Sequence, residues 1–211
     1  MSLSLLLASG SPQRRQLLTA AGYAFEIIVP HESVECGICS TGGPAALVSE
    51  LALKKAANVA SQLQKAHSKQ PSLLIACDTV AECDGSILGK PQNEEHAQAM
   101  LHLLRGRTHR VYSGLCVWPY QVKDSEASPE TRIVSTQLRM DNVSDDKLDE
   151  YLASNLWQGK AGAFGYQDRV GWLHIEQGSE SNVIGLPMEL LDEMLTPWKN
   201  QLSKSKNQDG T

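Results

Sequence analysis

The chain has 211 residues, 41% of them hydrophobic and 20% charged, which is enough for one large domain or two small ones with a buried core. Its net charge of -5 and the lack of a long basic run exclude a surface that wraps DNA or RNA, because nucleic acid phosphates require a basic face. No apolar stretch approaches the roughly 20 residues of a membrane span and no signal peptide is evident, so we expect a cytoplasmic protein that binds neither a nucleic acid polymer nor a membrane.

The first predicted unit is a strand, a turn of small residues and a helix. An apolar run over residues 3–8 stops before Ser11, which is a good N-cap, and Pro12 fits the first helical position. Arg14 and Arg15 follow in the first turn, beside backbone N–H groups that a helix leaves free. These amides and the helix dipole favour a phosphate or carboxylate, which an arginine can bind through two hydrogen bonds. The alternative is an ordinary strand–helix unit with two solvated arginines.

The rest of the chain alternates between strand and helix patterns. Runs of β-type residues predict strands over residues 23–29, 72–81, 86–88, 109–118, 131–140 and 172–176. Apolar periodicity and end signals predict helices over residues 45–65, 93–105 and 144–154, the last of them capped by Ser144, and a final helix opened by Pro187. Asp84 and Gly85 form a hairpin turn, and Gly106 provides a left-handed helix end.

This order of elements predicts a mixed α/β fold. We expect a strongly twisted central sheet flanked by helices, with two lobes around a cleft. We see no internal repeat or low-complexity linker, so we expect one domain over residues 1–203 and a polar tail over residues 204–211. In the helix over residues 45–65, Lys54 and Lys55 are expected on or near the flank of the apolar face.

The loop over residues 30–44 holds two cysteines and two glutamates. Cys36 and Cys39 have the spacing of half a zinc site, but no second pair follows, so we interpret them as ordinary loop residues. Five cysteines in all, an odd number, form no disulfide framework. Glu32 and Glu35 are candidate metal ligands, with a solvated loop position as the simpler interpretation of Glu35.

Two charged residues stand where an α/β sheet commonly binds its ligand. Asp78 follows the apolar residues 73–77 and could hold Mg²⁺ or act as a general base on water. The alternative is a structural aspartate bonded to turn amides. Lys90 lies between Gly89 and Pro91, a rigid frame that would direct it toward the same crevice, although it could also be an exposed loop lysine.

The late glycine-rich segment ends at Gln167. Its glycines allow close approach to a ligand, and the glutamine amide can recognise donors and acceptors on a base, although a purely structural turn would have the same composition. A G-x-S-x-G elbow, a Walker loop and G-x-G-x-x-G are all absent from the sequence. The sequence therefore disfavours a serine hydrolase, a P-loop NTPase and a Rossmann dehydrogenase.

Seven short motifs, taken together, resemble the Maf family of nucleoside triphosphate pyrophosphatases. They occur in the family's order and cover nearly the whole chain: LASGSPxR (7–14), LAxxKA (51–56), CDTV (77–80), DGxILGKP (84–91), GRTHxVYxG (106–114), KAGAFGYQ (160–167) and NVxGLP (182–187). The resemblance implies a fold similar to that of inosine triphosphate pyrophosphatases and hydrolysis of a nucleoside triphosphate to monophosphate and pyrophosphate. It also implies a divalent cation, Mg²⁺, Mn²⁺ or Co²⁺, and a homodimer.

The same resemblance assigns functional positions. It places Ser9, Arg14, Lys55 and Lys90 at the phosphates, Glu32 near the metal, Asp78 as proton acceptor and metal ligand, and Gln167 near the base. Within the family, the branch that resembles dTTP and UTP pyrophosphatases is matched by Thr79 and Gln167, whereas Gln13 stands where that branch has arginine.

These residues suggest a mechanism of hydrolysis, and two alternative functions stay open. Asp78 would orient or deprotonate a water for attack on the α-phosphorus, while Lys90 and the other cations oppose the charge of the leaving pyrophosphate. A non-catalytic nucleotide-binding regulator of septum formation in cell division would keep the phosphate cations but tolerate the loss of Asp78. A nucleotidyltransferase would need a second acceptor site, for which the sequence has no motif.

Overall fold

The computed structural model describes residues 3–31, 34, 42–122, 128–168 and 170–202. Its strands are β1 (Ser4–Leu7), β2 (Glu26–Ile27), β3 (Ser72–Cys83), β4 (Ser86–Leu88), β5 (Thr108–Tyr120), β6 (Glu130–Met140) and β7 (Leu173–Gln177). Its helices are α1 (Pro12–Ala20), α2 (Gly43–Lys65), α3 (Glu94–Leu104), α4 (Asp145–Ala153), α5 (Glu180–Ile184) and α6 (Met188–Leu195). Short 3-10 turns are η2 (Ala161–Ala163), η3 (Tyr166–Asp168) and η4 (Thr196–Trp198). No helix among these residues is both long and apolar enough to cross a membrane.

The strands form one mixed sheet. Their order is β2-β1-β3-β5-β6-β7, and β4 pairs with β3 outside this path. β1 runs parallel to β2 and β3, whereas β3, β5, β6 and β7 are antiparallel to their neighbours. The predicted mixed α/β fold with helices around a central sheet is therefore confirmed.

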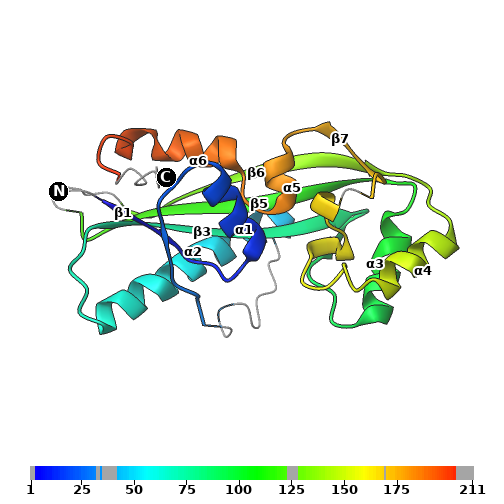
Figure 1. Ribbon diagram of the computed structural model, residues 1–211, viewed down its shortest axis with the longest axis horizontal. Helices are drawn as coiled ribbons and strands as arrows, with labels where there is room; N and C mark the ends of the chain where they lie inside the picture. The colour runs from blue at the N-terminus through cyan, green and yellow to red at the C-terminus, as the bar shows by residue number, and fades with distance from the viewer. Residues whose placement is uncertain (1–2, 32–33, 35–41, 123–127, 169, 203–211) are drawn as a thin grey trace, which may run out of the picture.

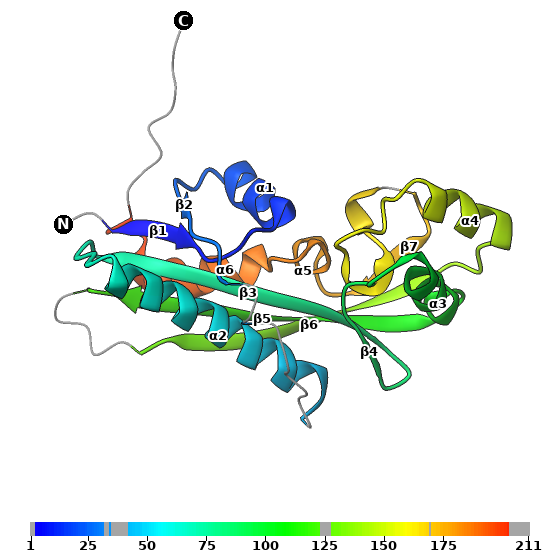
Figure 2. The same cartoon turned by 90° about the horizontal axis from the view of Figure 1, so that it is seen from below.

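At one end of the sheet, helices cover both faces. Leu6, Leu74 and Ala76 pack against α2, whereas Leu5, Leu73 and their odd-numbered neighbours pack against α1 and α6. This division follows from the strand repeat, because alternate side chains point to opposite faces. Figure 2 shows α2 on one side of the long strands and α1 on the other.

The other end of the sheet has its own apolar cluster. Side chains from α3, α4 and η2 pack there on the far halves of β3, β5 and β6. Figure 1 shows these helices at the opposite end of the molecule from β1, α2 and α6, with the long strands running through both ends. The two lobes that the sequence predicts are thus built on shared strands.

A gap along one edge of β3 separates the two lobes. β1 pairs with Ser72–Ile75 of β3, and β4 pairs with Ala81–Cys83. Between them, residues 76–80 pair with β5 on one edge and have no described strand on the other. Because this edge is open, Asp78 and Thr79 can contribute to one site although their side chains leave opposite faces of the sheet.

Several predicted boundaries need correction. The predicted strand over residues 23–29 is wrong in extent, because only Glu26–Ile27 pairs with β1 while Tyr23 and Phe25 pack on the apolar cluster from a loop. Helix α5 was not predicted, since it spans only Glu180–Ile184 and so lacks a periodic pattern.

Helix ends agree more closely with the sequence. Gly106 has the expected positive φ of 70° just after α3. Ser144 is the N-cap residue of α4, although its side chain makes no capping hydrogen bond. The predicted tail, residues 204–211, lies outside the described residues.

Candidate active site

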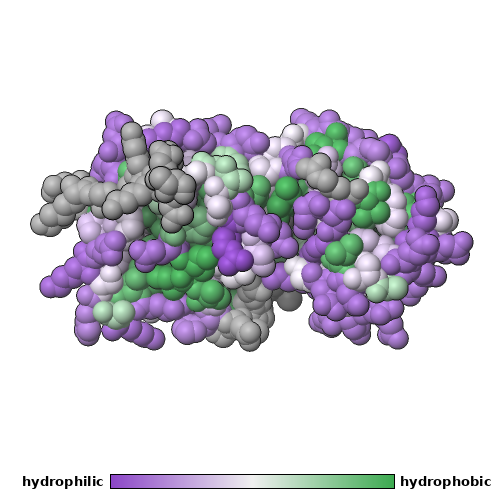
Figure 3. Space-filling model, in the orientation of Figure 1, coloured by the Kyte–Doolittle hydropathy of each residue, from purple (hydrophilic) through white to green (hydrophobic). Residues whose placement is uncertain are grey.

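A large cavity opens at the exposed edge of β3. Its volume is about 1070 Å³, and its lining comes from both lobes. Figure 3 shows the surface indented between the two ends of the molecule, close to the start of α1. The described residues that line the cavity include most of those predicted for the site: Ser9, Gln13, Arg14, Lys55, Asp78, Thr79, Lys90 and Gln167.

The turn between β1 and α1 forms one wall of the cavity. Ser11 caps the helix, because its side chain accepts a hydrogen bond from the backbone N–H of Arg14 at 3.4 Å, and Pro12 is the first helical residue. The Ser9 hydroxyl is buried and accepts hydrogen bonds from the Ser11 N–H at 3.1 Å and from Nη1 of Arg14 at 3.2 Å. The predicted cap is confirmed, and the free end of the helix lies at the cavity, where its dipole favours an anion.

Neutral oxygen atoms hold the Arg14 guanidinium in place. Its Nε donates to the carbonyl oxygen of Gly185 at 2.7 Å, and its Nη2 donates to Oγ1 of Thr79 at 3.4 Å. Oγ1 of Thr79 also lies 2.8 Å from the Ser113 hydroxyl. None of these partners carries a charge, so the arginine is oriented while its positive charge remains available to an anion.

Asp78 forms a buried ion pair with Lys55. The lysine Nζ lies 2.6 Å from Oδ1 of Asp78, and the two side chains are 7% and 11% exposed. Lys55 therefore lies on the buried face of α2, which corrects the expected position on its flank. A carboxylate has a second oxygen and several acceptor positions, so Asp78 can still hold a water or a cation.

A glycine on β5 allows this ion pair to form. Gly114 lies opposite Asp78 in the β3–β5 register, and a Cβ atom built on it would lie 2.3 Å from the carbonyl oxygen of Val48. Helix α2 thus rests directly on β5 at Val48. Lys55 follows seven residues later, two turns along the same helix face, which brings it over Asp78.

Positive charge dominates the described lining. Arg14, Lys55 and Lys90 line the cavity with one carboxylate, that of Asp78, whereas Lys160, also in the lining, is paired with Asp168 behind it. Lys90 is exposed at the cavity and, among the described residues, has no carboxylate partner. The rigid turn therefore directs Lys90 to the crevice as predicted, where it can meet an anionic ligand.

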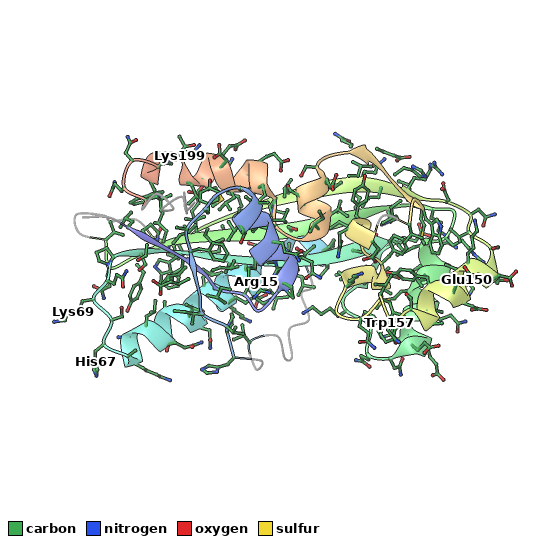
Figure 4. The ribbon with its side chains drawn as sticks, viewed as in Figure 1. Arg15, His67, Lys69, Glu150, Trp157 and Lys199 are labelled. Atoms are coloured by element: carbon green, nitrogen blue, oxygen red, sulfur yellow. The ribbon has the colours of Figure 1, made fainter. Side chains whose placement is uncertain are left out.

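Two glutamines line the cavity on different walls. Gln13 accepts a hydrogen bond from the Ser11 hydroxyl at 3.0 Å. The amide of Gln167, by contrast, has no hydrogen-bond partner within the described part of the chain. Arg15, labelled in Figure 4 on α1, is exposed and is not part of the described lining, so the two arginines of the first turn have different surroundings.

Of the predicted metal ligands, Asp78 lies in the described part of the chain. Glu32, together with Glu35, Cys36 and Cys39, lies outside the described residues. Within the described ranges no group of three metal-binding side chains occurs. One carboxylate is nevertheless compatible with Mg²⁺, which commonly takes one or two protein carboxylates and completes its shell with water and phosphate oxygens.

Sequence reasoning missed several residues that support the site. Gly114 and Gly185 belong to two of the quoted motifs, but the sequence does not show what they contact. Gly114 lies against the backbone of α2, and the carbonyl oxygen of Gly185 accepts a hydrogen bond from Arg14. Asn182 is buried and donates to the carbonyl oxygen of Val111 at 3.2 Å, which fixes α5 and hence Gly185 against β5. His109 is also buried, and its Nδ1 has no partner among the described residues.

Fold and site together define a class: an α/β protein with a deep interlobe cavity, cationic around a buried carboxylate. The Maf-like protein family matches residues 4–198, and the chain belongs to that family. A dTTP/UTP pyrophosphatase from Rhodopirellula baltica is 48% identical over 202 residues, covering 95% of this chain and 85% of the relative. Proteins with the same name from Bacillus mycoides and Chelativorans are 37% and 36% identical, covering 89% and 87% of this chain and 91% and 86% of their own.

Two solved structures are similar at low sequence identity. A HAM1 protein from Coxiella burnetii is 16% identical with a TM-score of 0.47, covering 92% of this chain and 99% of its own. The Ham1 protein of Staphylococcus aureus is 12% identical with a TM-score of 0.43, covering 66% and 72%.

Proposed function

We propose that this protein hydrolyses a nucleoside triphosphate at the α-phosphorus, giving a nucleoside monophosphate and pyrophosphate, with dTTP and UTP as substrates. The observation that carries the proposal is the buried Lys55–Asp78 pair inside a cavity that is otherwise cationic. The names of the relatives support the same reaction and substrates.

The triphosphate lies along the wall formed by the start of α1. The amides of the first turn, the Ser9 hydroxyl and the oriented Arg14 guanidinium bind its oxygens, and Lys90 opposes its charge from the other side of the crevice. Because the partners of Arg14 are neutral, binding an anion does not require breaking an ion pair.

Asp78 is the group that acts on water. Lys55 holds Oδ1, so the carboxylate is fixed in orientation and has a counter-ion in a buried place. A water bound to the free acceptor positions of Asp78 is then directed at the α-phosphorus, and the carboxylate takes its proton. Pyrophosphate leaves toward the cationic side chains, which stabilise its developing charge.

Asp78 is also the described residue that would hold a divalent cation, together with Glu32, which the family resemblance assigns to the metal. Such an ion polarises phosphate oxygens and offsets their charge. We expect Mg²⁺ or Mn²⁺ to support activity, with Co²⁺ as a third candidate.

The nucleobase lies at the end of the cavity formed by the glycine-rich segment. Gln167 supplies an amide whose donor and acceptor have no protein partner in the described chain, as a residue that recognises a base requires. Thr79 and Gln13 contribute to substrate choice from the opposite wall, Thr79 through its contact with Arg14.

A substrate panel tests the proposal. Canonical and modified nucleoside triphosphates are incubated with Mg²⁺, Mn²⁺ or Co²⁺, and pyrophosphate and orthophosphate are measured separately. We expect pyrophosphate as the first product, with UTP and dTTP hydrolysed fastest. Orthophosphate as first product would contradict the proposal.

Asp78→Asn tests the role of the carboxylate. We expect turnover to fall by about 10²-fold or more, as is usual for loss of a general base. Asp149→Asn, an exposed carboxylate on α4, is the matched control and should leave turnover unchanged. Near-normal turnover of a folded Asp78→Asn protein would return Asp78 to a structural role, and a wild-type protein that binds nucleotide without turnover would favour the regulator.

A further inference from the structure

The glycine-rich wall of the cavity contains a second buried ion pair. Nζ of Lys160 lies 2.5 Å from Oδ1 of Asp168, and the two side chains are 11% and 7% exposed. The Tyr151 hydroxyl donates to the other oxygen, Oδ2, at 2.9 Å. The Asp168 carboxylate is therefore held from two sides, by a residue at the start of its own segment and by one on α4.

Tyr151 is itself firmly placed. Its ring lies 4.9 Å from that of Phe164 and 5.8 Å from that of Trp172, centre to centre. Burial, reinforced by the charge of Asp168, raises the pKa of Tyr151, so its hydroxyl stays protonated and remains a donor. Asp168 is thus tied through Tyr151 to the apolar core of its lobe.

The Lys160–Asp168 pair closes residues 160–168 into a loop. Gly165 lies inside it: a Cβ atom there would be 2.8 Å from Nε2 of Gln167, 2.9 Å from Oδ2 of Asp168 and 2.9 Å from Cδ of Lys160. These three side chains therefore surround one glycine. Gln167 and Asp168 also belong to the same short turn, η3, in which the Asp168 N–H donates to the Gly165 carbonyl oxygen at 3.1 Å, so the ion pair anchors the turn that carries the Gln167 amide.

Asp168 differs from Lys160 and Gln167 in its access to the cavity. Lys160 and Gln167 line it, whereas Asp168 is not part of the described lining. With its side chain only 7% exposed and both oxygens already bonded, Asp168 is placed to act on a ligand through its neighbours. It also neutralises Lys160 in place, which leaves Arg14 and Lys90 as the cationic end of the cavity.

We propose that Asp168 is a positioning residue for nucleobase selection: by pairing with Lys160 and accepting from Tyr151, it fixes the turn that presents the Gln167 amide to the base, where the amide distinguishes a 4-oxo pyrimidine from a 4-amino pyrimidine. This rests on the proposed function, because it assigns the base to the wall that carries Gln167. Asp168 pairs with Lys160, whereas Asp78 pairs with Lys55, so the chemistry assigned to Asp78 is a separate claim.

The test compares UTP with CTP, which differ in the donor and acceptor pattern of the base. Asp168→Asn keeps the shape but loses the charge, and Tyr151→Phe keeps the aromatic packing but loses the hydroxyl. For Asp168→Asn we expect a KM for UTP about tenfold higher, a kcat within about threefold, and a UTP:CTP ratio of kcat/KM about tenfold lower, the factor that one lost hydrogen bond represents. Tyr151→Phe should shift the same ratio less, and Asp168→Glu should restore part of it. Asp149→Asn is the control for charge.

Asp168→Asn leaves Lys160 buried without its counterion and could prevent folding. The double variant Lys160→Gln with Asp168→Asn removes both charges, and it replaces the single variant in the same assays if that variant does not fold. An unchanged UTP:CTP ratio in folded variants, with only the thermal stability lowered, would show that the pair is structural and overturn the proposal. Binding of UTP and CTP is measured in parallel by calorimetry. A wild-type protein that releases no pyrophosphate overturns the proposed function, while the ratio of dissociation constants still decides the role of Asp168.

Discussion

Replacement of Gly114 by alanine should push helix α2 away from β5 and from the Asp78 carboxylate on the neighbouring strand β3. The new Cβ atom would lie 2.3 Å from the carbonyl oxygen of Val48 and 2.7 Å from the Ser49 nitrogen, both backbone atoms that no rotamer change can move away. Ordinary contact requires about 3.4 Å, so α2 must retreat by about 1 Å. Overpacking of this kind costs about 1–3 kcal/mol of unfolding free energy.

The displacement should also reach the active site. Nζ of Lys55 now lies 2.6 Å from Oδ1 of Asp78, and a retreat of about 1 Å would stretch this contact beyond the usual limit of about 3.2 Å. A misplacement of that size at a catalytic group can lower the rate by about 10²-fold. We therefore expect kcat for UTP to fall by one to two orders of magnitude at a temperature where Gly114→Ala is fully folded.

Thermal unfolding and steady-state kinetics test this together. Leu101→Ala is the control, because it removes a fully buried side chain from the other lobe and should cost about 2–5 kcal/mol without moving α2. Comparable kcat loss in both variants would attribute the effect to stability alone. A Gly114→Ala protein with wild-type stability and kcat would refute the argument from the close approach.

Three further predictions concern charged groups. Lys55→Met strands the buried Asp78 carboxylate and should lower the free energy of unfolding by about 3–5 kcal/mol, measured with denaturant; a loss below about 1 kcal/mol would contradict the burial of the pair. Arg14→Lys removes the guanidinium donors to Gly185 and Thr79 and should raise the KM for UTP about tenfold. An unchanged KM would mean that the Arg14 guanidinium does not bind phosphate. Burial lowers the pKa of His109 in the folded protein below its ordinary 6.5. As the pH falls below about 6.5, the unfolded chain therefore binds a proton at His109 before the folded protein does, and the folded protein loses stability. The melting temperature should drop between pH 7.5 and 5.5, and His109→Gln should flatten that drop; an equal drop in both proteins would exclude His109 as its source. The pKa values of Asp141 and Asp192, lowered by His174 and Lys199 respectively, affect stability only at lower pH.

The sequence predicted the main elements because they carry strong local signals. The apolar face of α2, the hairpin at Asp84 and the cap at Ser11 each follow from the side chains of adjacent residues. Helix α5 is too short for a periodic pattern, and β2 is a two-residue edge strand whose neighbours pack as a loop. Local patterns therefore identified long elements and missed those that only tertiary contacts stabilise.

The site was predicted through its motifs, whereas its geometry required the structure. Asp78 stood out as a charge at the end of an apolar run, but nothing local indicated that Lys55, on the predicted flank of a helix, is buried against it. The open edge of β3 depends on where β1 ends and β4 begins, which is a property of strand pairing. Asp168 carries no sequence signal at all, because its partners are eight and seventeen residues away.

The central claim, attack of water on the α-phosphorus, is tested most directly by an isotope. The protein hydrolyses UTP in ¹⁸O-labelled water, and the products are analysed by mass spectrometry. If Asp78 directs water to the α-phosphorus, the label appears in the monophosphate and the pyrophosphate carries none. Label in pyrophosphate, or in released orthophosphate, would place the attack at another phosphorus and contradict the account.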